Sequence, residues 1–437
     1  MSTFYTVAEL SRRGENDIPE SFSTARHLVY SSPATLAFNS PGAEGFGVKR
    51  AGLAIPGSVM LIVSPGCCGR NTSEISSIPQ YRKRFFYYEI QEPELVTGQH
   101  LKRIPEAVEE VCKSLPQKPS VVMICATCVD ALLGTDFDRV CRAAEARAGV
   151  RVRPCYMYAL TREGKKPPMV QVRQSLYSLL EPRTRKAADV NLLGFFAPLD
   201  DETELYAYLR GCGVKNVREI SRCADYDAFQ QMAGANFNLV LHPEARAAAD
   251  DLSVKHKMPF IELSQLYRID KIHSQYQALA RAIGGTIDDA ADYAAAKQAV
   301  EAFRAKHGPL RFAVGECLNA NPFELSLALT EYGFSVAEIY ATAQPGYYRW
   351  ISRLAARSPE TRVYCNQDPS MLFYEEENQV DVTLGKDAAF YHPDRPNLAF
   401  NSDRQIIQEM MKKQPLKIKI EEEKEIIKEI IKIEIEI

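Results

Sequence analysis

The stretch "LRFAVGECLNANPFELSLALTEYGFSVAEIYA", residues 310–341, joins two apolar segments through a segment with helical spacing. The central segment begins at an Asn-Pro pair and stops at Gly333. Proline near the first helical position and glycine just past the last one are typical helix boundaries. The pattern is therefore strand, helix and strand within 32 residues, which predicts a parallel βαβ unit.

The same alternation of short apolar runs and longer helical runs extends on both sides of this stretch. Strands are predicted at 58–64, 84–90, 120–127, 150–160, 189–198, 361–366 and 380–386. Helical spacing between them, as in residues 100–115, favours crossover helices. The sequence thus predicts an α/β fold of three Rossmann-like domains, each a mainly parallel sheet flanked by helices.

We expect the first α/β domain over residues 1–185, the second with a linking helix over 186–305, and the third over 306–400. Residues 401–437 form a low-complexity tail, in which every residue after Leu416 is Ile, Lys or Glu. Composition of this kind is typical of a solvated amphipathic segment or an extension. We assign the tail no function.

The charge balance excludes some partners. With 53 basic and 56 acidic side chains, the net charge is -3, so nothing in it attracts nucleic acid or an anionic membrane surface. The N-terminus has no apolar signal core, and no uncharged apolar run reaches the roughly 18 residues of a membrane span. A cytoplasmic protein is expected, in which the 11 cysteines are metal ligands or core thiols rather than a disulfide framework.

Two cysteine groups directly follow predicted strands. Cys67 and Cys68 lie in "SPGCCGRNTS" (64–73), and Cys125 and Cys128 lie in "ICATCVD". Open α/β sheets place ligands beyond the carboxyl ends of their strands, and thiolates are the ligands of iron–sulfur clusters. Four thiolates at such ends favour an iron–sulfur cluster, while zinc, a redox dithiol and structural thiols stay open as alternatives.

The residues around the paired cysteines suit a cluster. Gly66 and Gly69 allow the backbone to approach inorganic sulfide and donate N–H groups to it. Arg70 could neutralise the cluster charge or bind an acidic partner, although a solvated arginine is an equal interpretation. We therefore take Gly66, Gly69 and Arg70 as candidate cofactor-binding residues.

Four segments, taken in their order along the chain, resemble the component 1 superfamily of nitrogenase and nitrogenase-like reductases. This superfamily includes cofactor-assembly relatives and the reductases of protochlorophyllide and nickel tetrapyrroles. The resemblance runs from about residue 35 to about residue 400. The segments are "SPGAEGFG" (40–47), "LIVSPGCCGRN" (61–71), "CATCVDALLGTDFD" (125–138) and "FAVGECLNANPFELSLALTEYGFSVAEI" (312–339).

The resemblance implies a ligand set. Cys67 matches a family ligand, with Cys68 its neighbour, and Cys128 matches the ligand of the second loop. The family's first ligand has no counterpart, because "LAFNSPG" (36–42) contains no thiol. A four-iron, four-sulfur cluster is therefore expected in place of the larger nitrogenase cluster, with Cys68 and Cys125 restoring a set of four thiolates.

The resemblance also implies a function. We expect the catalytic, electron-accepting component of a nitrogenase-like reductase, whose cluster and substrate sites lie between domains and subunits. Its partner would be an ATP-hydrolysing iron–sulfur reductase homodimer, and the chain itself would form a homodimer or an α2β2 heterotetramer. A scaffold for metallocluster assembly and a non-catalytic subunit are the alternatives. No Walker loop occurs in the chain, so any nucleotide would bind the partner.

Three further residues are candidates for catalysis. His242 follows the second-domain strand at which dinitrogenase holds its cofactor through a cysteine, so a different metallocofactor or a tetrapyrrole stays open. The histidine could also form a hydrogen bond at a helix start or contact a substrate. Reduction of a substrate needs protons, and His242, Asp130 and Glu316 lie near predicted strand ends as candidate donors. Helix capping is the alternative role for Glu316, and also for Asp136 and Asp138, two further candidate donors that follow the second cysteine group.

Overall fold

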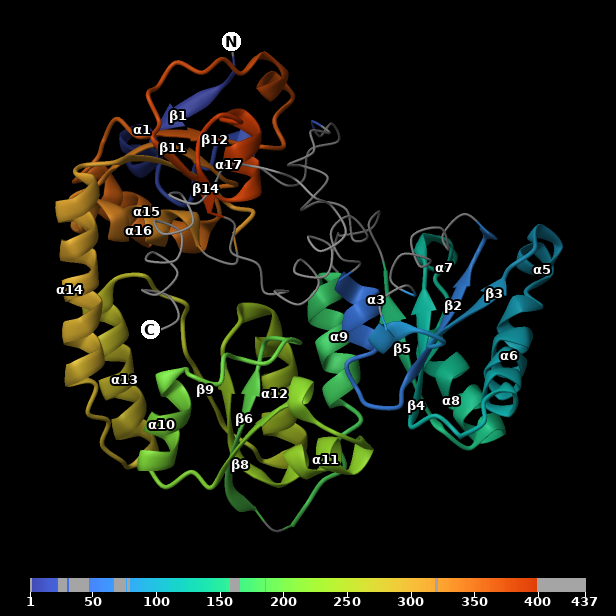
Figure 1. Ribbon diagram of the computed structural model, residues 1–437. Coiled ribbons are helices and arrows are strands. Elements are labelled where there is room, and N and C mark those ends of the chain that lie inside the picture. The colour runs from blue at the N-terminus through green and yellow to red at the C-terminus, as the bar shows by residue number, and fades with distance from the viewer. Residues whose placement is uncertain are drawn as a thin grey trace. The chain divides into compact units, whose positions relative to one another are not determined.

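The computed structural model describes residues 2–22, 30, 47–66, 76, 79–157, 166–184, 186–318 and 321–398. These residues form three sheets within two compact units (Figure 1). The two-sheet unit comprises Ser40–Pro198 and Gly213–Ser264, and the one-sheet unit comprises Met1–Asn39, Leu199–Cys212 and Gln265–Ile437. No helix in the described part of the chain is long and apolar enough to span a membrane.

The first sheet of the two-sheet unit has the strand order β3–β2–β4–β5, and all its strands are parallel. Its strands are β2 (Val59–Ser64), β3 (Phe85–Glu89), β4 (Val121–Ala126) and β5 (Arg151–Tyr156). Every residue of β2 and β4 is buried. A parallel sheet needs cover on both faces, and apolar strands without polar alternation satisfy this requirement.

Helices cover both faces of the first sheet (Figure 1). On one face, α6 (His100–Ser114) and α8 (Phe137–Ala148) pack on Ile124 and its neighbours, and on the other, α3 (Gly47–Gly52) and α9 (Pro168–Tyr177) pack near Cys125. Two short helices, α5 (Glu92–Thr97) and α7 (Cys128–Leu133), follow β3 and β4. Successive strand residues therefore enter different cores.

An acidic residue near a strand end caps helix α8, as considered from the sequence. Asp136 is its N-cap and accepts a hydrogen bond from the Arg139 N–H at 3.0 Å, and Gly149 ends the helix in the left-handed conformation. An N-cap carboxylate and a terminal glycine are the strongest local helix boundaries.

The second sheet of the two-sheet unit has the order β7–β6–β8–β9, again parallel. Its strands are β6 (Ala187–Leu193), β7 (Asn216–Glu219), β8 (Ala235–Val240) and β9 (Phe260–Glu262), with helices α11 (Tyr226–Gln231) and α12 (Arg246–His256). Helix α9 packs against α12 as well as against β5, so one apolar core joins the first and second sheets.

The one-sheet unit has the order β1–β12–β11–β10–β13–β14. Its strands are β1 (Phe4–Thr6), β10 (Arg311–Gly315), β11 (Ser335–Tyr340), β12 (Arg362–Tyr364), β13 (Val382–Leu384) and β14 (Asn397–Leu398). Its helices are α1 (Val7–Arg13), α10 (Glu204–Gly211), α13 (Ile269–Ile283), α14 (Ala290–His307), α15 (Pro322–Glu331), α16 (Tyr348–Ala355) and α17 (Lys386–Tyr391).

The predicted fold class is confirmed, and the βαβ unit of residues 310–341 is β10, α15 and β11, in parallel. One feature was not predicted from the sequence. The first strand, β1, pairs antiparallel with β12, with Phe4 opposite Tyr364, so the N-terminus belongs to the sheet of the C-terminal part (Figure 1). The partition into three domains stays a prediction.

Candidate functional site

The strands that precede the predicted cluster cysteines are direct neighbours. Strands β2 and β4 pair in parallel, with Val63 opposite Ala126. Cys67 follows β2 by three positions, and α7 begins at Cys128, two positions after β4. The strands that precede the two cysteine groups therefore end side by side at the carboxyl end of one sheet, where open α/β sheets bind ligands. Cys67, Cys68, Gly69 and Arg70 lie outside the described residues.

The start of the first loop is closely packed. A Cβ atom on Gly66 would lie 2.9 Å from Oε1 of Glu89, the last residue of β3. Thr127 Oγ1 donates to the Val63 carbonyl at 3.3 Å and ties the end of β4 to β2. Glycine at position 66 thus lets the chain pass close to the neighbouring strand end.

Asp130 lies in α7, and its side chain has no exposed surface. Its Oδ1 accepts a hydrogen bond from Thr135 Oγ1 at 3.4 Å, and its Oδ2 is buried without a partner among the described residues. Burial is the largest influence and raises the pKa of Asp130 to about 6. The charge of His100, which is buried at the start of α6, opposes this rise in the pKa of Asp130. His100 was not among the residues that the sequence pattern predicted for the site.

Cys125 faces a core instead of the strand end. It lies opposite Cys155 of β5, has no exposed surface, and places its Sγ 3.9 Å from Met157 Sδ. The hydrogen bond between the two thiols is the largest influence on both, lowering the pKa of Cys125 and raising that of Cys155. Among the described residues, no group of three or more His, Cys, Asp or Glu side chains could hold a metal ion.

His242 ends the loop after β8 and caps the short 3-10 helix Pro243–Ala245. Its Nδ1 accepts a hydrogen bond from the Glu244 N–H at 3.3 Å, so a neutral ring carries its proton on Nε2. Burial lowers the pKa of His242, and the nearby Arg173 guanidinium lowers it further against the opposing Glu244. The ring is therefore a neutral Nε2–H donor at pH 7, which disfavours metal ligation through Nε2.

Two neighbours fix His242 in place. Arg173 of α9 is buried and pairs with Glu244 at 2.7 Å, and it also donates to the Gly194 carbonyl at 2.6 and 3.0 Å. A Cβ atom on Gly194 would lie 2.8 Å from the His242 backbone nitrogen. Of the roles considered for this histidine, the structure shows the hydrogen bond at a helix start.

Glu316 follows β10 in the one-sheet unit. Its Oε2 accepts hydrogen bonds from the Thr342 N–H at 2.9 Å and Oγ1 at 3.1 Å. Its Oε1 is buried without a partner among the described residues. Burial, and then the charge of Asp387, raises the pKa of Glu316 to about 8. Because Oε2 accepts two hydrogen bonds, the proton of the neutral acid belongs on Oε1.

Asp387 was not predicted as a site residue. It lies in the first turn of α17 and accepts hydrogen bonds from the N–H groups of Glu316 at 2.7 Å and Cys317 at 3.2 Å, and from Asn366 Nδ2 at 2.9 Å. A Cβ atom on Gly315 would lie 1.8 Å from its Oδ1. The sequence carried one signal for Asp387, which is that a carboxylate directly follows the strand predicted at 380–386. Asp387 is 71 positions from Glu316, however, so the sequence pattern does not link the two residues.

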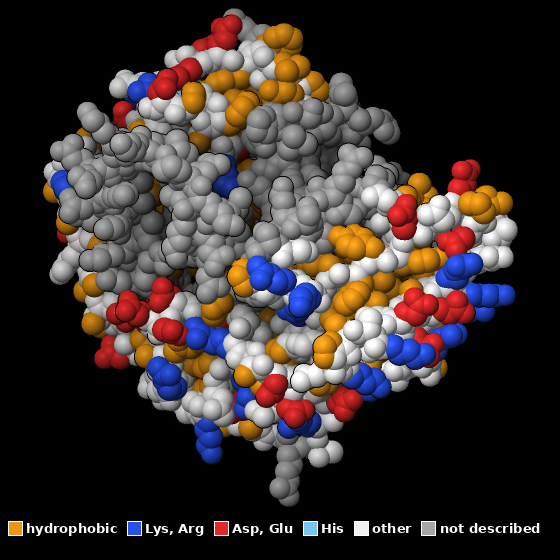
Figure 2. All heavy atoms as spheres, turned by 45° about the vertical axis from the view of Figure 1, so that its right-hand side comes forward, with side chains coloured by type: hydrophobic (Ala, Val, Ile, Leu, Met, Phe, Trp, Pro, Cys, Tyr) orange, Lys and Arg blue, Asp and Glu red, His pale blue; other side chains and the backbone are white. Residues whose placement is uncertain are grey.

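The candidate residues thus fall into two groups. The cysteine segments, Asp130 and His242 belong to the two-sheet unit, and Glu316 belongs to the one-sheet unit. On the face turned forward in Figure 2, acidic and basic side chains are interspersed with apolar ones, without a broad field of one sign among the described residues.

Residues 44–399 match the family described as nitrogenase component 1 type oxidoreductase. The chain belongs to this family. The resemblance inferred from the four motifs is therefore confirmed.

Curated relatives match this chain in sequence over part of its length. The chain is 24% identical over 256 residues to the nitrogenase iron-molybdenum cofactor biosynthesis protein NifE of Nostoc sp., covering 54% of this chain and 52% of that protein. It is 24% identical over 231 residues to NifE of Clostridium pasteurianum, covering 51% and 50%. The chain thus spans about half the length of these relatives.

The structure of this chain also resembles solved structures. It matches nitrogenase Cp1 at pH 6.5 with a TM-score of 0.65 and 17% identity, covering 88% of this chain and 89% of that one. A second match, nitrogenase Cp1 at pH 5, has a TM-score of 0.59 and 16% identity over 88% of this chain and 86% of that chain. At this identity the comparison establishes a shared fold.

Proposed function

We propose that this protein binds an iron–sulfur cluster at the shared edge of β2 and β4, with Cys67, Cys68 and Cys128 as thiolate ligands. The pairing of Val63 with Ala126 supports the proposal best, because the strands that precede the two cysteine groups end side by side. Burial of every residue in both strands supplies a low-dielectric base, which helps to set a cluster's potential. When bound, a four-iron cluster would supply one-electron transfer.

Gly66, Gly69 and Arg70 support the cluster in this proposal. Gly66 lies close to Glu89 of β3, where a side chain would not fit. Gly69 leaves the backbone free to approach, and Arg70 offsets negative charge on the thiolates. Cys125 was the predicted fourth ligand, but its contacts with Cys155 and Met157 favour a role inside the core.

We infer that the protein acts as an assembly scaffold, which receives a metallocluster as cargo and passes it to an acceptor protein. The names of the curated relatives support this role, since they are cofactor biosynthesis proteins. The lack of a cysteine at 36–42 is in keeping with it, because fewer fixed ligands favour release of the cargo.

A catalytic role is the second candidate, and the two neutral proton donors favour it. His242 presents an Nε2–H group, and Glu316 presents a carboxylic acid whose Oε1 has no partner among the described residues. Asp130 is a third buried carboxyl. In this role, the protein would accept electrons from an ATP-hydrolysing iron–sulfur reductase homodimer, as a homodimer or an α2β2 heterotetramer, and protonate a bound substrate.

One experiment separates the two roles. The protein, loaded with iron and sulfide under anaerobic conditions, is mixed with an apo-acceptor of the nitrogenase type, and separately with a reductase partner, ATP and acetylene. Transfer of iron to the acceptor without ethylene formation supports the scaffold. ATP-dependent ethylene formation, lost in Glu316→Gln or His242→Phe, supports the catalytic role.

A further inference from the structure

Four polar atoms meet in the core of the one-sheet unit, and we refer to them as the Glu338 site. They are Glu338 Oε2, the hydroxyl oxygens of Tyr340 and Tyr374, and His392 Nε2. Glu338 Oε2 lies 2.5, 2.8 and 2.9 Å from the other three atoms in that order. The two hydroxyls are 3.0 Å apart, and His392 Nε2 lies 3.1 and 3.2 Å from them. Each atom therefore contacts the other three.

Three elements bring these side chains together. Glu338 and Tyr340 are two positions apart on β11, so they lie on one face of the sheet. Tyr374 directly follows the 3-10 helix Pro369–Phe373, and His392 directly follows α17. Glu338, Tyr340 and His392 have no exposed surface, whereas Tyr374 is partly exposed. The site is thus buried, with one ligand on the side of the solvent.

Hydrogen bonds account for only half of the contacts in the Glu338 site. The two hydroxyls and His392 Nε2 bring at most one hydrogen each, so three of the six short separations have none. Glu338 Oε2 also has only about two lone-pair sites for three donors. A cation at the centre removes both conflicts, because all four atoms then act as its ligands.

We propose that the Glu338 site binds one trivalent metal ion, with Fe(III) as the representative. Four tetrahedral ligands at about 2.0–2.1 Å from a metal ion are separated from one another by about 3.3 Å. The three separations of 3.0–3.2 Å between the hydroxyls and His392 Nε2 are close to this value, and the shorter ones to Glu338 Oε2 lengthen on binding. Imidazole and the tyrosine phenolate are both ligands of iron.

Charge selects a trivalent ion. Binding releases one proton from each phenol to solvent and moves the proton of the neutral His392 ring from Nε2 to Nδ1. Four metal–ligand bonds form, and no oxidation state changes. The Glu338 carboxylate and two phenolates then carry three negative charges, which a trivalent ion cancels. A divalent ion would leave a net negative charge in the core, which is costly.

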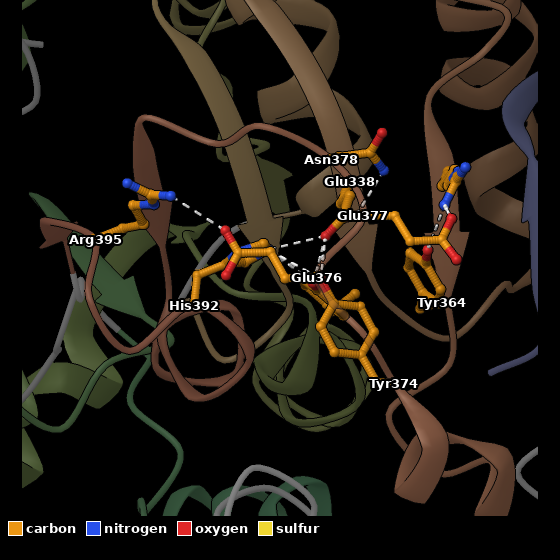
Figure 3. A network of polar contacts seen from close by, with 10 residues as sticks. Glu338, Tyr364, Tyr374, Glu376, Glu377, Asn378, His392 and Arg395 are labelled. Atoms are coloured by element: carbon orange, nitrogen blue, oxygen red, sulfur yellow. Dashed lines mark hydrogen bonds and ion pairs between the residues drawn. The ribbon is translucent and has the colours of Figure 1, made fainter. Parts of the chain in front are cut away.

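The surroundings hold two of the ligands in the orientation that a metal site needs (Figure 3). Glu376 Oε1 lies 3.4 Å from His392 Nδ1, and a carboxylate on this side of the ring orients Nε2 toward a metal. Arg395 pairs with Glu376 at 3.3 Å. Asn378 Nδ2 donates to Glu338 Oε1 at 2.7 Å, which leaves Oε2 for the metal.

The Glu338 site has an entrance and does not depend on the proposed iron–sulfur cluster. Residues 375–377 are exposed and directly follow Tyr374, so an ion can reach this phenol first. The site belongs to the one-sheet unit, whereas the cysteine segments belong to the two-sheet unit. It therefore holds whether or not an iron–sulfur cluster binds at the edge of β2 and β4.

The test uses the full-length chain with Cys67, Cys68 and Cys128 replaced by Ser, so that no iron–sulfur cluster contributes iron. The protein is titrated with ferric citrate, and its iron content is measured after gel filtration. A bond between Fe(III) and a phenolate gives a charge-transfer band in the visible range and tyrosinate vibrations in resonance Raman spectra. We expect about one iron per chain, with both signatures.

Conservative substitutions in this background decide the assignment. Tyr374→Phe and Tyr340→Phe each remove one ligand, so each should weaken the band and lower the affinity by more than the roughly 10- to 100-fold typical of outer-shell changes. Tyr364→Phe is the matched control. The rings of Tyr364 and Tyr374 are 5.5 Å apart, but the Tyr364 hydroxyl accepts from Arg362 at 3.4 Å and has no contact with Glu338 Oε2. This control should leave iron binding unchanged.

Three results would overturn the proposal. The first is no bound iron, or iron without the phenolate band, in the folded background protein. The second is a band that Tyr374→Phe leaves at full strength, or that Tyr364→Phe removes. The third is displacement of the iron by an equal concentration of Zn(II), which refutes the trivalent assignment. Because Tyr374 is partly exposed, Tyr374→Phe keeps the test decisive if Tyr340→Phe does not fold.

Discussion

The side chains of Glu338 and His392 are hydrogen-bonded in the core of the one-sheet unit, with Oε2 and Nε2 2.9 Å apart and neither side chain exposed. Tyr374 and Asn378 also donate to the Glu338 carboxylate, at 2.8 and 2.7 Å (Figure 3). Tyr340 donates to it at 2.5 Å. Strand β11, the segment after β12 and the end of α17 are thereby joined at one carboxylate. A buried charge with this many donors is sensitive to the loss of any of them.

The buried Glu338 carboxylate makes the fold sensitive to acid. Burial by itself raises the pKa of Glu338, but hydrogen bonds from His392 and its other donors reverse this and hold the pKa below the usual 4.5. The carboxylate therefore stabilises the fold above that value, and the contribution is lost as the pH falls through the lowered pKa. Urea unfolding from neutral to acid pH should show falling stability, with a shallower fall in Glu338→Gln.

The same substitution tests the strength of the pair. At pH 7, Glu338→Gln should lower the free energy of unfolding by about 1–3 kcal/mol, because it leaves buried hydrogen-bond donors of His392, Tyr340 and Tyr374 without a matched acceptor. Glu376 also pairs with His392, at 3.4 Å, but its side chain is 39% exposed. Glu376→Gln is therefore the control, with an expected loss of at most about 1 kcal/mol. Equal losses in both variants would refute the assignment.

Glu316 should carry its proton at neutral pH. Burial and the Asp387 charge raise its pKa to about 8, so ionisation destabilises the fold as the pH rises from its usual 4.5 toward that value. Difference infrared spectroscopy should show a carboxylic acid band that titrates near pH 8 and is absent in Glu316→Gln. The hydrogen bond from Thr342 Oγ1 lowers the pKa of Glu316. Thr342→Val removes this bond and should therefore move the titration of Glu316 to higher pH. A band that titrates near its usual 4.5 would contradict this account.

Gly315 should tolerate no side chain. Because a Cβ atom there would lie 1.8 Å from Asp387 Oδ1, Gly315→Ala must displace a carboxylate that binds three donors. We expect a loss of at least about 3 kcal/mol in unfolding experiments, the upper end for overpacked cores. Gly346→Ala is the control, since a Cβ atom there would have no described atom within 4 Å apart from its own chain neighbours. Its loss should be below about 1 kcal/mol.

The tautomer of His242 can be measured directly. Nitrogen-15 shifts should show a protonated Nε2 and an unprotonated Nδ1 at pH 7, because Nδ1 accepts the Glu244 N–H. The ring should titrate below its usual 6.5. Glu244→Gln should lower this pKa further, since the Glu244 charge raises it. A proton on Nδ1 would instead restore His242 as a candidate metal ligand through Nε2.

The sequence predicted those parts of the fold that depend on local signals. The Asn-Pro start and the Gly333 stop define α15, and both flanking apolar runs are strands. Strand β1 escaped prediction because three residues carry little periodic signal, and its partner β12 lies near the other end of the chain. Long-range pairing of this kind has no local signature.

The site was predicted less completely for a related reason. Placement of Cys128 at a strand end follows from chain order, but the direction of Cys125 depends on which face of β4 it occupies. Both faces of that strand are apolar, so alternation gives no answer. The interaction between Glu316 and Asp387 likewise depends on contact between strand ends far apart in sequence.

The most direct test of the account is the iron and acid-labile sulfide content, with EPR, of the protein purified anaerobically. We expect about four irons per cluster in the natural chain. Cys67→Ala, Cys68→Ala and Cys128→Ala should lose this iron, while Cys125→Ala and the control Cys365→Ala, at a buried thiol of the one-sheet unit, should retain it. Zinc or no metal in the natural chain, or equal iron in all variants, would contradict the proposed cluster at the edge of β2 and β4.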